Sequence, residues 1–268
     1  MKIDLVIWTL NSEKFLEKVL VNAEKVIGKK NINQKILVDG GSKDRTIEIG
    51  KSLGWKILTS LKRGIAHQAN LALNCVETEF FVSIEHDLLL NKNWFKIIPK
   101  YFKDKSVSVA QGIHISTNPI LYKHDLWLMY DSGIKHDAYG ISIDNTMFRT
   151  EDIRSVGGFP ELCPISCDRE LRDEIRKINK KWIIDRNLRS WHLRSNYWDS
   201  VIHDCKYAML RERKERTNAR SDRMKLWGKI PFIQVYYSLK YLHEPRLLPY
   251  YTLHKLSLIL GYFRRKCL

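Results

Sequence analysis

The sequence FFVSIEHD, residues 80–87, decides the fold of this chain. Its apolar run predicts a buried strand, and two carboxylates, Glu85 and Asp87, follow the strand one residue apart. Carboxylates at that spacing point to the same side of an extended chain, where their like charges repel each other. A divalent cation that also holds a phosphate would relieve this repulsion. The alternative is that both acids open the following helix, whose N-terminal dipole favours negative charge.

Apolar runs and helical patterns alternate in the residues before this strand. Residues 3–8 and 36–38 predict strands, and each run is followed by polar residues and a helical pattern that stops at a glycine, Gly28 or Gly54. Residues 55–58 predict a third strand and residues 65–76 a third helix. Such alternation predicts an α/β fold with a mostly parallel, Rossmann-like sheet flanked by helices, which binds ligands at the carboxyl ends of its strands.

Polar residues and glycines follow the predicted strands, so one crevice at the carboxyl ends would collect them. They are Thr9, Asn11, Asp39, Gly40, Gly41, Glu85 and Asp87. The Asp39 carboxylate suits hydrogen bonds from a base or a ribose, or Asp39 and Gly40 simply form a turn. The two glycines take positive φ or let backbone approach a ligand. Neither the P-loop nor the dinucleotide glycine spacing occurs.

The second half of the chain has a less regular pattern. Residues 94–101 and 168–180 predict helices, residues 107–110 and 140–148 predict strands, and residues 112–140 predict an irregular wall over the crevice. Asp168 falls in the first turn of its helix, where an acid can be a cap or a catalytic group. His192 closes the globular part as a candidate metal ligand, with a purely structural histidine as the alternative.

The C-terminal part is strongly basic. The 268-residue chain has a formal charge of +16, and residues 201–268 hold 15 Lys and Arg against 5 Asp and Glu. Helical patterns cover residues 201–209, 232–242 and 249–263, and the last is apolar and followed by cations. Such a helix suits a membrane interface, and packing against the core or a second subunit is the alternative. We predict a globular domain over residues 1–200 and a basic helical appendage over residues 201–268.

The five cysteines are scattered, which favours a reduced intracellular compartment over a disulfide scaffold. Cys163 and Cys167 are the pair that could bind zinc or form a disulfide. The sequence shows no leader pattern and no apolar run of about 18 residues. We expect a cytoplasmic protein that is peripheral at the cytoplasmic face of a membrane.

Six sequence blocks occur in order between residues 3 and 195. They are VIWTLNSEKFLEKVL, ILVDGGSKDRTIEI, RGIAHQANLAL, FFVSIEHDLLL, MFRTEDIRSVGGFPE and CDREL. Together they resemble the inverting glycosyltransferases of family 2, which have the GT-A fold. The residues that this resemblance implies for binding a nucleotide sugar are Thr9, Asn11, Asp39, Gly40, Arg63, Asn70 and Glu85.

The resemblance also implies a metal motif and a catalytic base. Glu85 and Asp87 stand where the family has Asp-x-Asp, which implies Mn²⁺ or Mg²⁺ as the cofactor, and Asp168 stands where the family has its base. Two residues depart from the family pattern. Glu85 replaces the first Asp of the metal motif, and Cys167 replaces the Glu that usually precedes the base and helps to orient the substrate.

The function that the resemblance implies is inverting transfer of one sugar. The donor would be a UDP- or GDP-linked sugar, and the acceptor a hydroxyl of a glycan or of a lipid-linked molecule. A metal would stabilise the diphosphate leaving group while a carboxylate takes the acceptor proton. The Gln-x-x-Arg-Trp motif of processive polysaccharide synthases does not occur. An anionic membrane surface is an expected partner, and nucleic acid is not.

Two other functions stay open from the sequence. A nucleic-acid-binding protein on a degenerate transferase fold would use the basic tail for phosphates, and salt-sensitive retention on nucleic acid without donor hydrolysis would favour it. A sugar nucleotidyltransferase is the other, but its Gly-rich, Lys-containing phosphate loop does not occur near the N-terminus.

Overall fold

The computed structural model describes residues 1–62, 64–127, 140–161, 167–194, 196–214 and 243–263. The chain divides into two compact units, which are unit 1 (Met1–Ile115 and Lys135–Leu193) and unit 2 (Ser116–Ile134 and Arg194–Leu268). The predicted division at residue 200 differs from this grouping. It would cut through helix α8 (Tyr197–Lys214), and it leaves out the segment after Ile115 that belongs with the C-terminal helices.

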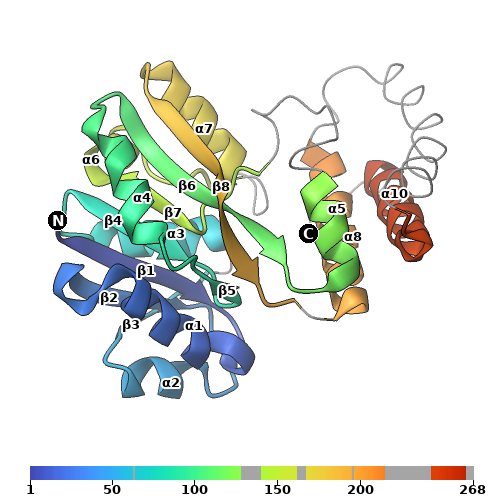
Figure 1. Ribbon diagram of the computed structural model, residues 1–268, viewed down its shortest axis with the longest axis horizontal. Helices are drawn as coiled ribbons and strands as arrows, with labels where there is room; N and C mark the ends of the chain where they lie inside the picture. The colour runs from blue at the N-terminus through green and yellow to red at the C-terminus, as the bar shows by residue number, and fades with distance from the viewer. Residues whose placement is uncertain (63, 128–139, 162–166, 195, 215–242, 264–268) are drawn as a thin grey trace. The chain divides into compact units, whose positions relative to one another are not determined.

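Unit 1 is built on one eight-stranded sheet in the order β3-β2-β1-β4-β7-β6-β8-β5 (Figure 1). The strands are β1 (Ile3–Thr9), β2 (Ile32–Asp39), β3 (Lys56–Thr59), β4 (Phe80–Ile84), β5 (Leu88–Leu89), β6 (Val107–Ser116), β7 (Thr146–Arg149) and β8 (Lys181–His192). Strands β1 to β4 pair in parallel, whereas β7 pairs antiparallel with both β4 and β6, and β5 pairs antiparallel with β8. The predicted α/β class is confirmed, and the sheet is mixed because it contains both parallel and antiparallel strand pairs.

Strands β1 and β4 and the second half of β2, residues 36–39, are buried on both faces, which explains their continuous apolar runs. On one face, Ile3, Leu5 and Ile7 of β1 pack in a core with Leu16 and Leu20 of α1. Alternate residues of the same strands form a second core on the opposite face, together with helices α3, α6 and α7. The two-residue period of a strand therefore divides one apolar run between two helical layers.

The helices of unit 1 follow the predicted crossovers. They are α1 (Glu13–Ile27), α2 (Thr46–Ser52), α3 (Ile65–Cys75), α4 (Trp94–Ile97), α6 (Thr150–Ser155) and α7 (Cys167–Lys177), with the 3-10 helices η1 (Lys29–Asn31) and η2 (Ile98–Lys103). Helix α1 buries Leu16, Val19, Leu20, Ala23 and Ile27, the three- and four-residue spacing of one helix face. It ends where Gly28 takes φ +84°, a backbone conformation that favours glycine.

The later strands differ most from the sequence predictions. Residues 181–192 form the longest strand of the sheet, although no strand was predicted there. The strand predicted over residues 140–148 is confined to β7, and the predicted strand over residues 107–110 continues to Ser116. The prediction of an irregular wall over residues 112–140 was wrong in its first part, because β6 is followed there by helix α5 (Pro119–Leu126). Residues 128–139 lie outside the described residues.

Unit 2 contains α5, α8, the 3-10 helix η6 (Pro245–Leu247) and α10 (Leu248–Phe263). Leu121, Val201, Leu247, Tyr250 and Tyr251 form its small apolar core. Other apolar side chains of α8 and α10 stay exposed: Trp198, Ile202, Leu253, Leu256 and Leu260. The helix predicted over residues 232–242 lies outside the described residues. Among the residues that are described, no helix combines the length and apolarity that crossing a bilayer requires.

Candidate functional site

Thr9 and Asp39 end the parallel strands β1 and β2, and the sheet register places them opposite each other. Asp39 is completely buried, and its carboxylate accepts hydrogen bonds from the N–H groups of Gly41 and Ser42, both at 2.8 Å. The hydroxyl groups of Ser42 and Thr9 donate to its other oxygen, at 2.5 and 3.4 Å. Asp39 therefore organises the turn that follows β2, which was the alternative left open by the sequence.

The loops after β1 and β2 are linked by reciprocal hydrogen bonds. Asn11, which takes φ +50°, donates its backbone N–H to Ser42 Oγ at 2.8 Å and accepts from the N–H of Lys43 at 2.9 Å. Ser12 N–H donates to Thr46 Oγ1 at 2.7 Å, and Glu13 N–H donates to an Asp44 oxygen at 3.0 Å. These bonds fix the polar rim of the crevice before any ligand arrives.

Gly40 and Gly41, in the loop after β2, are required to be glycine for different structural reasons. Gly41 has φ +94° and open space around it, so its backbone conformation requires the absence of a side chain. Gly40 faces the side chain of Gln68, and an added Cβ would lie 2.8 Å from Gln68 Nε2. Gln68 on α3 donates to the carbonyl oxygens of Thr9 and Val38, at 3.1 and 3.3 Å, and so joins both strand ends.

Asn70 on α3 is engaged by the loop that follows α6. Its amide donates to the carbonyl of Phe159 at 2.8 Å and accepts from the N–H of the same residue at 2.7 Å. A Cβ on Gly158 would lie 2.6 Å from Asn70 Oδ1, so this contact requires glycine. Asn70 thus fixes the glycine-rich loop, a role that the sequence did not predict. Arg63, the other residue expected beside the nucleotide, lies outside the described residues.

The acids after β4 form a cluster with histidines. Ligand atoms of Glu85, His86 and Asp87 lie within 4.8 Å of one another, and this is the one such group among the residues that the structure describes. His192 reaches them because β5 pairs with β8 and brings Leu88 opposite His192. Its Nε2 lies 3.1 Å from Asp87 Oδ1 and 3.6 Å from Glu85 Oε2. The structure therefore brings together all three predicted metal ligands.

The composition and spacing of this cluster fit a divalent cation. Carboxylate oxygens suit both Mn²⁺ and Mg²⁺, whereas an imidazole nitrogen suits a transition metal such as Mn²⁺ better than Mg²⁺. Two ligands at right angles about 2.1 Å from a cation lie about 3 Å apart. The 3.1 Å between Asp87 Oδ1 and His192 Nε2 is a hydrogen-bond distance, and it also matches this spacing. The ring of His114 on β6 packs edge-on against His192, with centroids 5.2 Å apart, and helps to orient it.

Asp168 lies in the first turn of α7, as predicted. Burial raises the pKa of its carboxyl, and the charge of Asp144 acts in the same direction. The backbone N–H of Arg169 donates to Asp168 Oδ1 at 2.8 Å and, with the Arg169 charge, opposes this rise in pKa. A half-buried carboxylate with a raised pKa binds a proton more readily than an ordinary aspartate, which suits a general base.

Several residues of this region were missed by the sequence predictions. They are Ser42, Gln68, His86, His114, Asp144 and Glu161. Of these residues, His86 could have been predicted from the sequence, since it lies between two predicted metal ligands. The others come from separate elements that only the folded chain brings together.

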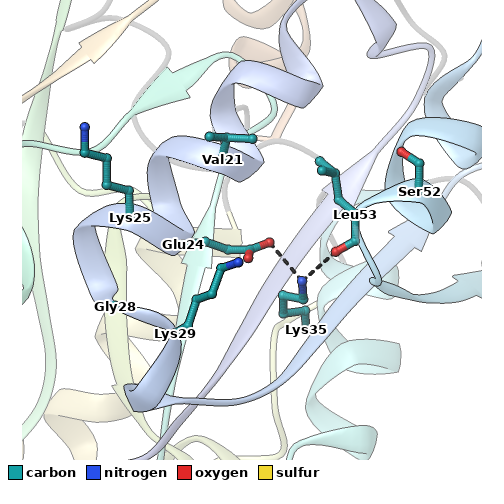
Figure 2. A pocket seen from close by; sticks show the side chains of 8 residues that line it. All are labelled: Val21, Glu24, Lys25, Gly28, Lys29, Lys35, Ser52 and Leu53. Carbon is teal, nitrogen blue, oxygen red and sulfur yellow. Dashed lines mark hydrogen bonds and ion pairs between the residues drawn. The ribbon is translucent and has the colours of Figure 1, made fainter.

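A cavity of about 610 Å³ lies beside α1 and holds none of these residues (Figure 2). Its lining includes Lys35, which donates to Glu24 Oε1 at 2.9 Å and to the carbonyl of Leu53 at 2.6 Å. Lys35 and Glu24 thus tie β2 and α1 to the end of α2. We therefore attribute this cavity to the way these three elements pack together.

The chain is similar to proteins of known structure in its fold. No curated protein sequence matches the chain. The fold is similar to that of the mannosyltransferase PcManGT from Pyrobaculum calidifontis, solved in complex with GDP-Man and Mn²⁺. The TM-score is 0.63 at 17% identity, over 94% of this chain and 73% of that one.

A second similar structure is glucosyl-3-phosphoglycerate synthase from Mycobacterium tuberculosis in complex with Mn²⁺, UDP and glucosyl-3-phosphoglycerate. Its TM-score is 0.55 at 14% identity, over 75% of this chain and 74% of that one. The model of the glycosyl transferase family 2 matches residues 4–155, which include the loops after β1 and β2 and the segment of Glu85, His86 and Asp87. With more than half of its length matched, the chain belongs to family 2 of the glycosyltransferases and is an enzyme of that class.

Proposed function

We propose that this glycosyltransferase moves one sugar from a UDP- or GDP-linked donor to a hydroxyl of a glycan or lipid-linked acceptor, with inversion. The observation that carries this proposal is the cluster of Glu85, His86, Asp87 and His192 beside the Thr9–Asp39 strand ends. The neighbouring structures were solved with GDP-Man or UDP, which supports a nucleotide-linked donor without selecting the base.

The nucleotide would bind over the linked loops after β1 and β2. Asn11 and Gly41 are exposed at this rim, whereas Thr9 and Asp39 are buried beneath it. We therefore assign Thr9 and Asp39 to shaping the loops and the exposed backbone around them to contacting the nucleotide. Asn70 would act on the same site by holding the Phe159 loop. Arg63 stays in the proposal as a residue beside the nucleotide.

Asp87, Glu85 and His192 would hold Mn²⁺ or Mg²⁺. When bound, the ion supplies positive charge that stabilises the departing diphosphate. The protein's part is to fix the ligands: β4 presents the two acids and the β5–β8 pairing presents His192. His86 is a fourth donor at the same place.

Asp168 would remove the acceptor proton. As the acceptor oxygen forms its bond to the anomeric carbon, the hydroxyl proton passes to an Asp168 oxygen. The bond between the anomeric carbon and the diphosphate breaks, and its electron pair leaves with the nucleoside diphosphate. A single displacement of this kind inverts the configuration at the anomeric carbon.

Unit 2 would bring the enzyme to an acceptor at an anionic membrane surface, on the cytoplasmic face. Leu253, Leu256 and Leu260 are exposed at the three- and four-residue spacing of one face of α10. Tyr250 and Tyr251 of the same helix are buried in the core of unit 2, so they hold the helix in place by packing. Exposed leucines in a part of the sequence that is strongly basic suit a helix at the surface of an anionic bilayer.

The function is tested by incubating the full chain with UDP- and GDP-linked sugars and Mn²⁺, and following sugar release and transfer. We expect one donor class to be hydrolysed only with the metal, and NMR of the product to show inversion. Hydrolysis that persists in EDTA, or retention of configuration, would contradict the proposal.

The membrane role is tested by sedimentation with anionic liposomes at low salt. We expect the full chain to sediment and Leu256→Glu with Leu260→Glu to reduce binding about tenfold or more, because each charge opposes burial in the interface. Val21→Glu, which changes an exposed apolar residue of α1, is the matched control. A full chain that stays in the supernatant would contradict the membrane role.

A further inference from the structure

The cavity beside α1, called the α1 cavity below, is lined by lysines, and so is a smaller neighbour. The α1 cavity has a volume of about 610 Å³, which is usual for a small-molecule pocket, and Lys25, Lys29 and Lys35 line it. The smaller cavity, of about 370 Å³, shares Lys29 and Lys35 with it and adds Lys56. Glu24 is the one acid that lines either cavity. This part of unit 1 therefore gathers four cations around a single carboxylate.

The carboxylate of Glu24 is already neutralised by Lys35. Their side chains are 13% and 20% exposed, and Lys35 Nζ lies 2.9 Å from Glu24 Oε1. Trp55 Nε1 donates to the same oxygen at 3.3 Å. Figure 2 shows Lys35 joined both to Glu24 and to the carbonyl of Leu53, which lies 2.6 Å away. The pair is therefore a fixed wall of the α1 cavity, and Glu24 does not neutralise the other three lysines.

These other lysines come from separate elements. Lys25 lies in the last turn of α1, Lys29 in η1 and Lys56 at the start of β3. All three are exposed, and none forms an ion pair with a residue that the structure describes. Lysines on a convex surface are simply solvated, whereas these border concave space that a ligand can occupy. Each ammonium group is carried on a flexible stem and can turn toward such a ligand.

The ends of two helices oppose this positive charge. α1 ends at Ile27 and α2 at Ser52, and both Gly28 and Ser52 line the α1 cavity. A helix C-terminus carries about half a negative elementary charge, so the two ends contribute about one. The Asn31 amide donates to the Ile27 carbonyl at 2.7 Å and offsets part of it. The four lysines, less Glu24 and the helix ends, leave about two positive charges, so the cationic character prevails.

We propose that the α1 cavity is a binding site for a phosphate-bearing anion, which Lys25, Lys29 and Lys56 would hold against the fixed Glu24–Lys35 pair. A phosphate ester carries about −1.5 to −2 charges at pH 7, which matches the surplus, and lysine binds phosphate as a point charge. The site shares no residue with the nucleotide loops or the metal cluster, and it is independent of the proposed function. A soluble phosphate compound and a phospholipid headgroup offer the same chemistry, and experiment distinguishes them.

The direct test titrates the full chain with pyrophosphate in EDTA and follows ¹⁵N–¹H NMR spectra and calorimetry. EDTA removes divalent cations, so binding that needs a metal at Asp87 does not contribute. We expect the amide signals of Gly28, Lys29 and Gly54 to shift, and the affinity to fall as salt rises from about 50 to about 200 mM. Asp87→Ala should bind pyrophosphate as the wild type does.

The decisive variant combines Lys29→Gln with Lys56→Gln and leaves the Glu24–Lys35 pair in place. We expect its pyrophosphate affinity to fall about tenfold or more, because two cations near a doubly charged ligand are lost. Lys18→Gln with Lys92→Gln, which removes two exposed lysines that line neither cavity, is the matched control and should bind within about twofold of the wild type. Unchanged affinity in the Lys29 and Lys56 variant, an equal loss in the control, or shifts only at other amides would overturn the site.

Sedimentation with phosphatidylglycerol liposomes identifies the source of the phosphate. The background is Leu256→Glu with Leu260→Glu, which changes the proposed membrane face of α10. Sedimentation that remains in this background and is lost with Lys29→Gln and Lys56→Gln would assign the site to a phospholipid headgroup. A chain that stays in the supernatant but binds pyrophosphate at Gly28 and Lys29 would assign it to a soluble phosphate compound.

Discussion

Asp39 and Asp168 are two acids of unit 1 in opposite surroundings. Asp39 is completely buried, yet N–H and hydroxyl donors from Thr9, Gly41 and Ser42 compensate its charge. Asp168 is half-buried, and desolvation raises its pKa beyond what the Arg169 N–H and charge offset. The difference teaches that burial alone does not identify a catalytic acid. Asp168, the proposed base, differs from Asp39 in that its burial is not fully compensated.

The largest expected effect is a loss of catalysis when the Asp168 side of this comparison is changed. Asp168→Asn keeps the size of the side chain but cannot accept the acceptor proton, so kcat for transfer should fall about 10²- to 10⁴-fold. Nucleotide affinity, measured by calorimetry with Mn²⁺, should stay within about twofold. Asp173→Asn on the exposed side of α7 should transfer sugar normally. Near-normal transfer by Asp168→Asn would show that Asp168 only caps α7.

The next effect concerns the metal cluster. Asp87→Ala and His192→Ala each remove a donor, so the affinity for UDP or GDP with Mn²⁺ should fall about 10- to 100-fold or more. Affinity in EDTA should be the same for both variants and the wild type. Calorimetry with and without EDTA measures this, with Glu48→Ala, an exposed acid of α2, as the control. Equal wild-type affinity in both conditions would contradict a metal site here.

The third prediction tests whether the main role of Asp39 is to stabilise the loop after β2. Asp39→Ala leaves buried donors of the loop without a partner, so the free energy of unfolding should fall by about 2 kcal/mol. Urea denaturation measures this, and Glu48→Ala should leave the free energy of unfolding nearly unchanged because its ion pair is exposed. If Asp39→Ala is as stable as the wild type but loses nucleotide affinity, Asp39 contacts the nucleotide directly.

The N-terminal half of unit 1, strands β1 to β4 with their helices, could be predicted from sequence because each signal there is local. The apolar runs of β1, β2 and β4 are continuous since both faces of these strands are buried. The polar residues that end these strands meet because parallel strands share an edge. The acids after β4 were therefore placed correctly, although Asp39 turned out to bond its own loop.

The other half could not be predicted because its signals are long-range. Strand β8 is only half-buried along most of its length and carries Asp185, Arg186 and Arg189, so it lacks an apolar run. Its pairing with β5 is what brings His192 to Asp87. Asp144 sits in an Asp-Asn pair that is typical of a turn, and only the folded chain brings its charge to Asp168.

The smallest expected effect concerns a third kind of acid, Glu161, which is exposed but well bonded. It lies 3.0 Å from Lys62 Nζ and 3.3 Å from His67 Nδ1, and it accepts from Asn70 at 3.1 Å. The bond from Lys62 contributes most to lowering the pKa of Glu161 to about 2. Glu161 thus links the loop after β3 to the loop that Asn70 holds through Phe159.

We expect a coupling free energy of about 0.5 kcal/mol between Lys62 and Glu161, because solvent screens exposed ion pairs. A double-mutant cycle of Lys62→Met and Glu161→Gln, read by urea denaturation, measures it. Since the folded pKa of Glu161 is lowered, the coupling should be full above about pH 4.5, its ordinary value, and disappear as pH falls toward 2. The Arg45–Glu48 pair is more exposed and has fewer partners, so the same cycle there should give a smaller value. Equal coupling at pH 7 and pH 2.5 would mean that contacts other than charge join the two loops.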